Sequence, residues 1–174
     1  MTAHNLRPMT ETDLEQVLSW RNHPEVRRYM YTTHEIGMEE HSKWFSSIKL
    51  DPAVNLMIYE NQGLAKGFLN ITRTRCQEVA DWGFYLAPGA PKGTGRSLGG
   101  EALRYAFEEL GLHKLCGQAL GFNERSIAFH KALGFSEEGR LRDQHFDGYE
   151  FHDVFYFGLL KQEWQTKDQE LKND

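Results

Sequence analysis

The sequence has only two cysteines, Cys76 and Cys116, and they stand far apart. Two isolated cysteines cannot form the dense disulfide framework of a small secreted domain. No run of about 18 apolar residues occurs, so the sequence predicts no membrane-spanning helix. The opening stretch MTAHNLRPMTETDLEQ has no apolar segment typical of a signal peptide. We therefore expect the cytoplasm as the compartment.

A strong charge of one sign is also missing. Twenty Lys and Arg stand against 25 Asp and Glu, which gives a net charge of −5. Nucleic-acid binding depends on positive charge, so this balance argues against such a partner. The eight histidines show no spacing with cysteine or carboxylate that is typical of zinc, and we expect no metal. Basic residues gather at Arg21, Arg27 and Arg28 and again at Arg73 and Arg75, which suits a small anionic ligand or ordinary surface charge.

Length and composition favour one folded unit. The 174 residues are enough for one domain with a sizeable core and too few for two of comfortable size. Hydrophobic residues make up 40% and charged residues 26%, which is ordinary for a globular protein. We therefore expect a single domain over residues 1–174, with a polar tail from about 161 to 174.

The hydrophobic pattern predicts an α+β domain. Helical spacing dominates the first 50 residues, and a stripe from Met38 to Ile48 includes His41 among apolar side chains. From residue 55 onward three short strands follow one another and predict an antiparallel meander. Further along, a fifth strand precedes a helix, and Asp147-Gly148 between two apolar runs predicts a β-hairpin. The predicted strands are 5–9, 55–60, 67–75, 79–87, 113–120, 138–146 and 149–160, and the predicted helices start near residues 10, 25, 38, 95 and 123.

A glycine-rich segment, PGAPKGTGRSLGG, follows the third strand of the meander. Glycines let the backbone approach a phosphate closely, and the helix that follows adds unpaired N–H groups and a positive dipole end. The segment is neither a P-loop nor a dinucleotide-binding fingerprint. By itself it fits a phosphate site or a plain flexible turn.

The stretch FNERSIAFHKALGF predicts one short helix that contains an unexplained histidine. Asn123 can cap its beginning, and Gly134 can end it in the left-handed conformation. Ser126 and His130 then share one face of the helix with Phe129 and Leu133. His130 is either ordinary packing or a chemical group.

The order of these elements, together with N-x-x-S-I-x-x-x-K-x-x-G-F, resembles the GNAT acetyltransferase family over residues 4 to 160. This resemblance implies a mixed central sheet of about seven strands flanked by helices, with acetyl-CoA as the co-substrate. The family's pyrophosphate signature corresponds to Ala90–Gly95, where both glycines are present and the leading Gln or Arg is absent. Lys92 and Arg96 can supply charge there.

The resemblance also implies which residues meet the cofactor. The strand from Trp82 to Leu86 is expected to splay from its neighbour and pair with pantetheine. His130 occupies the position of a family tyrosine that protonates the departing thiolate, and we expect the same role for it. The expected cofactor contacts are Phe84, Tyr85, Leu86, Lys92, Gly93, Thr94, Gly95, Arg96, Ser97, Asn123, Ser126 and Lys131.

Three stretches, WRNHPEVRRYMYT, HSKWF and EGRLRDQHFDGYEFHDVFYF, are similar to the acetyltransferases of pseudaminic acid synthesis. These enzymes act on a UDP-linked amino sugar, which the resemblance implies as the acceptor. The acceptor-binding positions correspond to Arg21, His41, Thr72 and Arg73, the last being Lys in the relatives. Each has an ordinary alternative: Arg21 can close a helix, and His41 can be a hydrogen-bonded core histidine.

The reaction implied is direct attack of a neutral amine on the thioester, with backbone amides polarising the carbonyl. No carboxylate stands out as the base, and Asp81 and Glu124 are only candidates. Other functions remain open: a GNAT enzyme that acts on a protein N-terminus or a small amine, and a regulator that binds acetyl-CoA without turnover.

Overall fold

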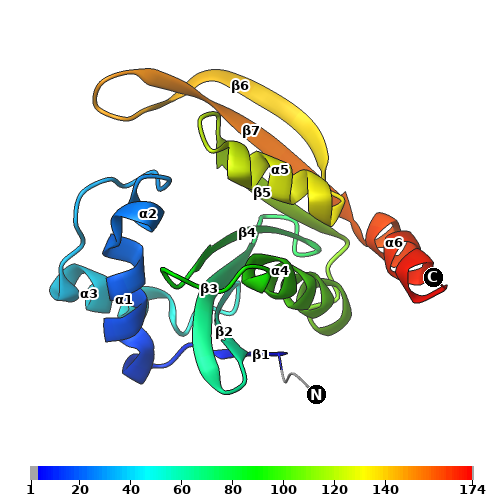
Figure 1. Cartoon of the computed structure of the whole chain (residues 1–174), viewed down its shortest axis with the longest axis horizontal. Helices are drawn as coiled ribbons and strands as arrows, with labels where there is room; N and C mark the ends of the chain where they lie inside the picture. Colours follow the sequence, from blue (N-terminus) through cyan, green and yellow to red (C-terminus); the bar gives the residue numbers. More distant parts are fainter. Residues whose placement is uncertain (1–3, 174) are drawn as a thin grey trace. The chain divides into compact units, whose positions relative to one another are not determined.

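The structure is a computed structural model that describes residues 4–173, with side chains as far as Lys167. Its described strands form a seven-stranded mixed sheet in the order β1-β2-β3-β4-β5-β7-β6, and helices accompany it (Figure 1). The predicted α+β class with about seven strands is therefore confirmed. None of the described helices is long and apolar enough to cross a lipid bilayer.

The boundaries of the elements follow the predicted ones to within a few residues. In chain order the elements are β1 (His4–Pro8), the 3-10 turn η1 (Glu11–Asp13), α1 (Leu14–Asn22), α2 (Pro24–Arg27), α3 (Met38–Ile48), β2 (Val54–Asn61), β3 (Leu64–Arg73), β4 (Val79–Leu86), α4 (Thr94–Arg104), the π-helical turn η2 (Tyr105–Glu109), β5 (Lys114–Leu120), α5 (Glu124–Leu133), β6 (Ser136–Phe146), β7 (Phe151–Leu160) and α6 (Lys161–Asn173).

The chain divides into two compact units, which we describe separately. Unit 1 consists of Met1–Thr72 and Gly83–Ala102, and unit 2 consists of Arg73–Trp82 and Leu103–Asp174. Strand β4 contributes to both. The expectation of a single domain stays a prediction.

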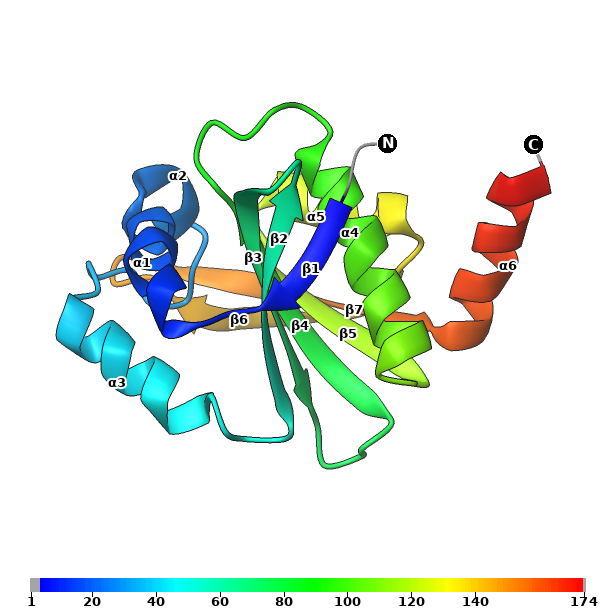
Figure 2. The ribbon, with the colours of Figure 1, turned by 90° about the horizontal axis from the view of Figure 1, so that it is seen from below.

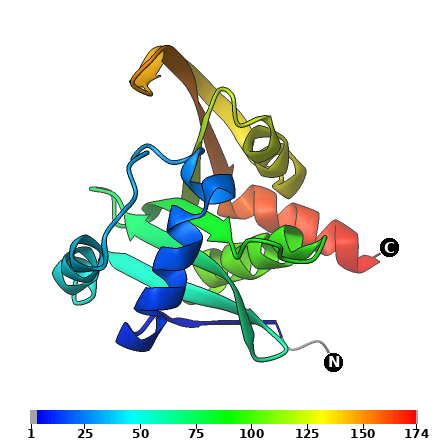
Figure 3. The same ribbon diagram turned by 60° about the vertical axis from the view of Figure 1, so that its left-hand side comes forward.

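Unit 1 is built on the predicted antiparallel meander. Strand β2 pairs with β1 on one side and with β3 on the other, both antiparallel. Helices α1 and α3 pack on one face through a cluster that includes Trp20, Phe45 and Phe68. Helix α4 covers the opposite face, where its fully buried Leu98 lies against Gly67 of β3 (Figure 3).

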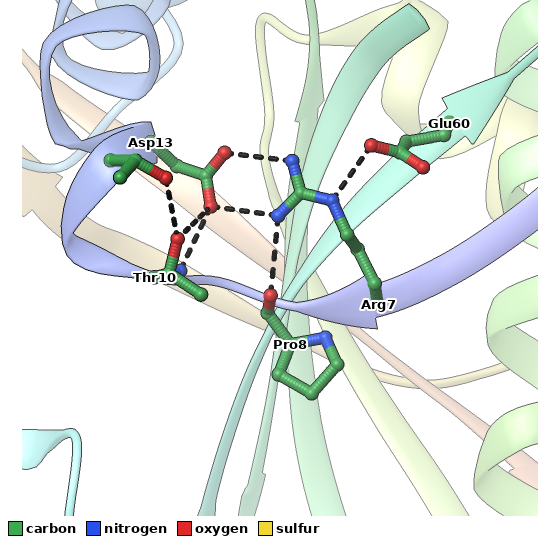
Figure 4. Close-up of polar contacts among 6 residues, drawn as sticks. Arg7, Pro8, Thr10, Asp13 and Glu60 are labelled. Atoms are coloured by element: carbon green, nitrogen blue, oxygen red, sulfur yellow. Dashed lines mark hydrogen bonds and ion pairs between the residues drawn. The ribbon is translucent and has the colours of Figure 1, made fainter. Parts of the chain in front are cut away.

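The start of α1 is fixed to β1 and β2 by an ion-pair network around Arg7 (Figure 4). Two guanidinium nitrogens donate to the Asp13 carboxylate at 2.8 Å each, and Nε donates to Glu60 at 2.7 Å. The same carboxylate accepts the Thr10 N–H at 2.8 Å, which completes a capping box between Thr10 and Asp13. The bonds from Arg7 are the largest cause of the lowered pKa of Asp13.

Unit 2 contains the beginning of β4 beside β5 and the long β6–β7 hairpin (Figure 2). The hairpin turn is centred on Gly148 and Tyr149, one residue later than predicted, because the Asp147 N–H donates to the Glu150 carbonyl and closes the ladder. Gly148 has a φ of +102°, which suits the first central position of a type II′ turn.

The polar tail predicted from about residue 161 forms helix α6. The Glu163 carboxylate accepts the Leu160 N–H at 2.9 Å and satisfies a donor at the beginning of α6. Trp164 stacks on Phe107 with ring centroids 5.3 Å apart. One long-range aromatic contact thus anchors a helix whose own sequence is almost entirely polar.

Candidate functional site

The glycine-rich segment of unit 1 adopts the geometry of an anion site. A turn closed by the bond from Ala90 N–H to the Ala87 carbonyl (3.1 Å) leads away from β4. Gly93 then takes a φ of +94° directly before α4, a conformation that favours glycine. The N–H groups of Gly95 and Arg96 lie in the first helical turn, where no intrahelical acceptor is within reach. These donors at the positive end of the helix fit a pyrophosphate.

The side chains of this segment face different ways. Lys92 and Arg96 are exposed, and their positive charges stand beside the N–H groups. Thr94 is buried with 6% of its surface exposed. The Ser97 hydroxyl hydrogen-bonds with the fully buried Tyr59 phenol, which also contacts His4 Nδ1 at 2.6 Å. The cofactor roles of these residues stay predictions, and Ser97 already has a protein partner.

The segment of β4 that was expected to meet pantetheine presents its backbone. The parallel pairing of β4 with β5 covers Val79–Asp81 and so ends before Phe84. The Tyr85 side chain turns toward α1 and α3, where its ring lies 5.0 Å from that of Phe68. A contact between this segment and the cofactor would therefore involve backbone groups, and the Tyr85 side chain belongs to a different environment.

Arg21 and His41 form a second polar site in unit 1, and each has a buried nitrogen without a hydrogen-bond partner among the described residues. These atoms are Arg21 Nη1 and His41 Nε2. Arg21 Nη2 donates to the Thr32 carbonyl at 3.0 Å, and the other His41 nitrogen bonds to the Leu14 carbonyl. Buried polar atoms are normally paired, so two orphaned ones at one place point to a ligand.

The electrostatics of this Arg21–His41 pair follow from burial. His41 is 4% exposed and stacks on Trp44 with centroids 5.2 Å apart. Burial, first, and the charge of Arg21, second, lower the pKa of His41, so its ring is neutral at pH 7. With its proton on Nδ1 for Leu14, Nε2 offers a lone pair. Burial also lowers the pKa of Arg21, which nevertheless remains charged.

Thr72 and Arg73, the other predicted acceptor residues, differ from this pair. Thr72 is half-buried at the end of β3, opposite Val54. The Arg73 guanidinium donates to the Leu110 carbonyl at 2.9 Å and to the Gln77 carbonyl. A cation bonded to Leu110, at the end of the π-helical turn η2, has a clear structural role. The acceptor-binding role of Arg73 stays a prediction that its geometry does not favour.

Helix α5 of unit 2 is capped as the sequence predicts. The Asn123 side-chain oxygen accepts the Ser126 N–H at 3.1 Å, and Gly134 ends the helix with a φ of +100°. Lys131, a predicted cofactor residue, pairs with Glu137 at 3.2 Å. The contacts of Asn123, Ser126 and Lys131 with the cofactor stay predictions.

His130 has a complete set of hydrogen bonds inside unit 2. It is 2% exposed, and its Nε2 accepts the indole N–H of Trp82 at 3.1 Å. Because an indole can only donate, the imidazole proton must be on Nδ1, which donates to the Ser126 carbonyl at 2.8 Å. Burial lowers the pKa of His130, against the charged form that the proton-donor role would favour.

The surroundings of His130 were not visible in the sequence pattern. Gly117 of β5 makes room for the bond, since a β carbon there would lie 2.5 Å from His130 Nε2 and 2.6 Å from Trp82 Nε1. In the sequence Trp82 begins the strand that is expected to pair with pantetheine. Its role depends on a partner 48 positions away, and no local periodicity reports such a contact.

One group of possible metal ligands lies at the tip of the β6–β7 hairpin. Asp147, Glu150 and His152 bring their ligand atoms within 4.8 Å of one another. One Asp147 oxygen accepts the N–H groups of Tyr149 and Glu150, and the other contacts His152 at 2.6 Å. These bonds lower the pKa of Asp147 to about 2 and account for the arrangement as a turn.

Comparison with known proteins identifies relatives of the whole chain. Two strains of Campylobacter jejuni have proteins named acetyltransferase PseH, 26% and 29% identical over 91% of this chain and 92% of theirs. Spermidine N(1)-acetyltransferase of Escherichia coli is 24% identical over 94% of this chain and 90% of its own. A solved structure of spermidine N-acetyltransferase from Vibrio cholerae, in complex with CoA and spermine, has the same fold (TM-score 0.86, 23% identity, 93% and 98% coverage).

The family follows from a match that spans most of the chain. The profile of the acetyltransferase (GNAT) domain matches residues 5–136, which include the glycine-rich segment and α5. The positive φ of Gly93 and the N–H groups of Gly95 and Arg96 are compatible with a phosphate site at the start of α4. The chain therefore belongs to the GNAT family and is an acetyl-CoA-dependent N-acetyltransferase.

Proposed function

We propose that this chain transfers the acetyl group of acetyl-CoA to the 4-amino group of a UDP-linked amino-dideoxy sugar. The observation that carries the proposal is the Arg21–His41 pair, with one unpartnered buried nitrogen on each side chain. Arg21 offers a charged donor, and neutral His41 offers a lone pair. A nucleotide sugar complements both, because its phosphate oxygens accept and its hydroxyl groups donate.

The charge of the pair favours an anionic acceptor over a polyamine. Arg21 cannot lose its proton under ordinary conditions, and its partial burial strengthens its field. A polyamine brings several positive charges and only N–H donors, so it would be repelled by Arg21 and could not accept its hydrogen bond. A UDP-linked substrate carries the opposite charge.

The likeness to the two Campylobacter jejuni PseH proteins supports the same substrate class. It extends over 91% of this chain, although the identity is only 26–29%. Arg21 and His41 lie in the two N-terminal stretches that carry the resemblance to acetyltransferases of pseudaminic acid synthesis. Pseudaminic acid synthesis is therefore the process in which we expect the enzyme to act.

In the proposed reaction the sugar amine attacks the thioester carbonyl directly. The C–N bond forms, the C–S bond breaks, and the amine proton leaves as coenzyme A departs. The N–H groups of Gly95 and Arg96 hold the pyrophosphate, and backbone groups of Phe84–Leu86 align the pantetheine arm. The role of His130 as proton donor stays a prediction that its hydrogen bonds do not favour, because its Nε2 already accepts the Trp82 N–H.

A second candidate, acetylation of a polyamine, has one observation in its favour. A surface hollow of unit 1 is lined by Gly37, Glu39, Glu40 and Lys43, and carboxylates attract polyamines. Both carboxylates are already engaged, however. Glu39 pairs with Lys43 at 2.6 Å, and Glu40 contacts His34 at 3.1 Å. This candidate therefore ranks below the nucleotide sugar.

The deciding experiment compares acceptors under identical conditions. The purified protein is given acetyl-CoA and, separately, a UDP-4-amino-4,6-dideoxy sugar, spermidine, or a peptide with a free N-terminus. Thiol release and the mass of the product are measured. We expect the highest kcat/KM for the nucleotide sugar, with one acetyl group added.

Two controls give the comparison its meaning. The 4-hydroxy analogue of the sugar lacks the amine and should release no thiol above background. Arg21→Gln should reduce the preference for the nucleotide sugar over spermidine. A higher kcat/KM for spermidine or the peptide would refute the proposed acceptor, and coenzyme A binding without any turnover would indicate a regulator.

A further inference from the structure

Strand β3 places Asn70 on a sheet face that helices cover only in part. Leu69 and Ile71 point to one face and are 0% exposed. Phe68 on the other face is 5% exposed, because Trp44 of α3 lies against it with centroids 6.2 Å apart. Asn70 follows on that same face and is only half-buried. The helical cover within unit 1 therefore ends between Phe68 and Asn70.

Asn70 lies directly over the backbone of the neighbouring strand. The bond from the Ala87 N–H to the Lys66 carbonyl (2.9 Å) and the contact between Phe68 and Tyr85 fix the register of β3 with β4. The next pair on this face is Asn70 opposite Gly83. A β carbon at Gly83 would lie 2.6 Å from Asn70 Oδ1, so the glycine is what allows the amide to occupy this place.

The amide of Asn70 has no hydrogen-bond partner in the described part of the chain. Asn22 shows what a structural asparagine does here, since its side chain bonds both the N–H and the carbonyl of Ile36 at 2.8 and 2.7 Å. Asn55 likewise donates to the Ile71 carbonyl. An amide that takes a cleared position on the sheet and bonds to nothing in the protein is available to a ligand.

Asn70 also lies close to the other groups that face a ligand in unit 1. Gly83 is two residues from Tyr85 on the same face of β4, a separation of about 7 Å. The Tyr85 phenol interacts with the charge of Arg21. Gly83 directly precedes Phe84–Leu86, the backbone segment expected to align the thioester. The amide is therefore beside the place where the acceptor amine must approach.

We propose that Asn70 is an acceptor-binding residue, whose amide holds a polar group next to the reacting amine while Arg21 and His41 hold the remainder of the acceptor. The proposal rests on the proposed function for the identity of that acceptor. An amide both donates and accepts, so it can bind a sugar hydroxyl in one defined orientation. Gly83 contributes only the space that this orientation requires.

The test is a set of steady-state measurements in which each substrate is varied in turn. Asn70→Ala should raise the KM for the nucleotide sugar about fivefold to tenfold, as expected for one neutral hydrogen bond. Asn70→Asp should raise it further, because the carboxylate lacks the donor and repels phosphate. Gly83→Ala should displace the amide and give the same selective effect. The KM for acetyl-CoA should stay within about twofold in all three variants.

Asn5→Ala is the matched control, since Asn5 is an exposed asparagine on β1. It should leave both KM values unchanged. Thermal unfolding of each variant separates a binding effect from a folding effect, and Asn70→Ala should unfold at the wild-type temperature. An unchanged KM for the sugar, or an equal rise in both KM values, would overturn the proposal.

The two proposals fail in different ways. If the wild-type protein acetylates spermidine or a peptide in place of the nucleotide sugar, the proposed function is wrong. The Asn70 variants are then measured with that amine, and a selective rise in its KM would still support acceptor binding by Asn70. If the wild-type protein acetylates the nucleotide sugar and Asn70→Ala behaves like Asn5→Ala, only the assignment of Asn70 is wrong.

Discussion

His41 in unit 1 and His130 in unit 2 look alike by burial and differ in their hydrogen bonds. They are 4% and 2% exposed, and burial is the main cause of the lowered pKa of each. His130 has partners for both nitrogens, in Trp82 and Ser126. His41 Nε2 has none among the described residues. Burial therefore does not distinguish the two histidines, whereas the unpartnered nitrogen of His41 does.

The two predicted arginines repeat this contrast. Arg73 donates to two backbone carbonyls of unit 2, at Gln77 and Leu110. Arg21 has one carbonyl partner and a second buried nitrogen with none. A site whose polar groups are satisfied by the protein is stable by itself, whereas a site with orphaned groups gains stability when a ligand binds. This difference leads us to expect ligand contacts at Arg21 and His41.

The largest loss of stability is expected at Gly117, where the buried surroundings of His130 are most tightly packed. Gly117→Ala places a β carbon 2.5 Å from His130 Nε2 and forces Trp82 and His130 apart. Overpacking and a broken buried hydrogen bond together should lower the free energy of unfolding by about 3 kcal/mol. Urea unfolding measures the change. Gly139→Ala, where the β carbon meets open space, should change it by less than about 0.5 kcal/mol; equal values for both variants would contradict the crowding.

Substituting each histidine with phenylalanine tests the comparison directly. His130→Phe leaves the Trp82 N–H without an acceptor and should destabilise the fold by about 2 kcal/mol. His41→Phe removes both the orphaned Nε2 and the bond from Nδ1 to the Leu14 carbonyl, and because these two changes oppose each other, the unfolding free energy should change by less than about 1 kcal/mol. The effect on activity should be the opposite. His41→Phe should raise the KM for the acceptor, and His130→Phe should not.

The same His130→Phe variant decides between packing and catalysis. A proton donor would lower kcat by roughly 10²–10⁴-fold when removed. The hydrogen bonds of His130 favour packing, so we expect kcat to fall less than about tenfold at a temperature where the variant is folded. A larger loss, with the alkaline side of the pH profile abolished, would establish His130 as the acid.

Substituting Arg21 and Arg73 should give smaller changes, and these changes separate an effect on binding from an effect on folding. Arg21→Gln should raise the KM for the nucleotide sugar about 10- to 100-fold, which is the range for a charge-assisted bond. Arg73→Gln should leave that KM within about threefold and lower the unfolding free energy by about 1 kcal/mol, because the Leu110 carbonyl loses its charged partner. The opposite pattern would move the acceptor site to Arg73.

The smallest effect concerns pH. Both folded histidines have a lowered pKa, so the unfolded chain binds protons more readily than the folded one below pH ~6.5. Stability should be complete above that pH and decrease as the pH falls, by at most about 1.4 kcal/mol per pH unit for each histidine. Unfolding at pH 7.5 and 5.5 measures the slope, and His130→Phe should reduce it. An unchanged slope would mean that His130 does not contribute.

Much of the fold could be predicted because it depends on local patterns. The caps at Asn123 and Gly134, the meander and the helix after the glycine-rich segment all follow from residues within a few positions of one another. The helix α6 could not, since its polar sequence is anchored by Trp164 on Phe107, 57 positions away. The hairpin was predicted, but the turn shifted because Asp147 pairs with Glu150.

By itself the sequence determined the class of fold and the family, because these depend on glycines, capping residues and the order of elements. Only the tertiary structure decided which polar side chains are already satisfied. Trp82 reaches His130, Leu110 reaches Arg73 and Gly83 clears space for Asn70 from distant positions in the chain. Hydrogen-bond partners are set by distance in space, and a periodic pattern along the chain does not contain that information.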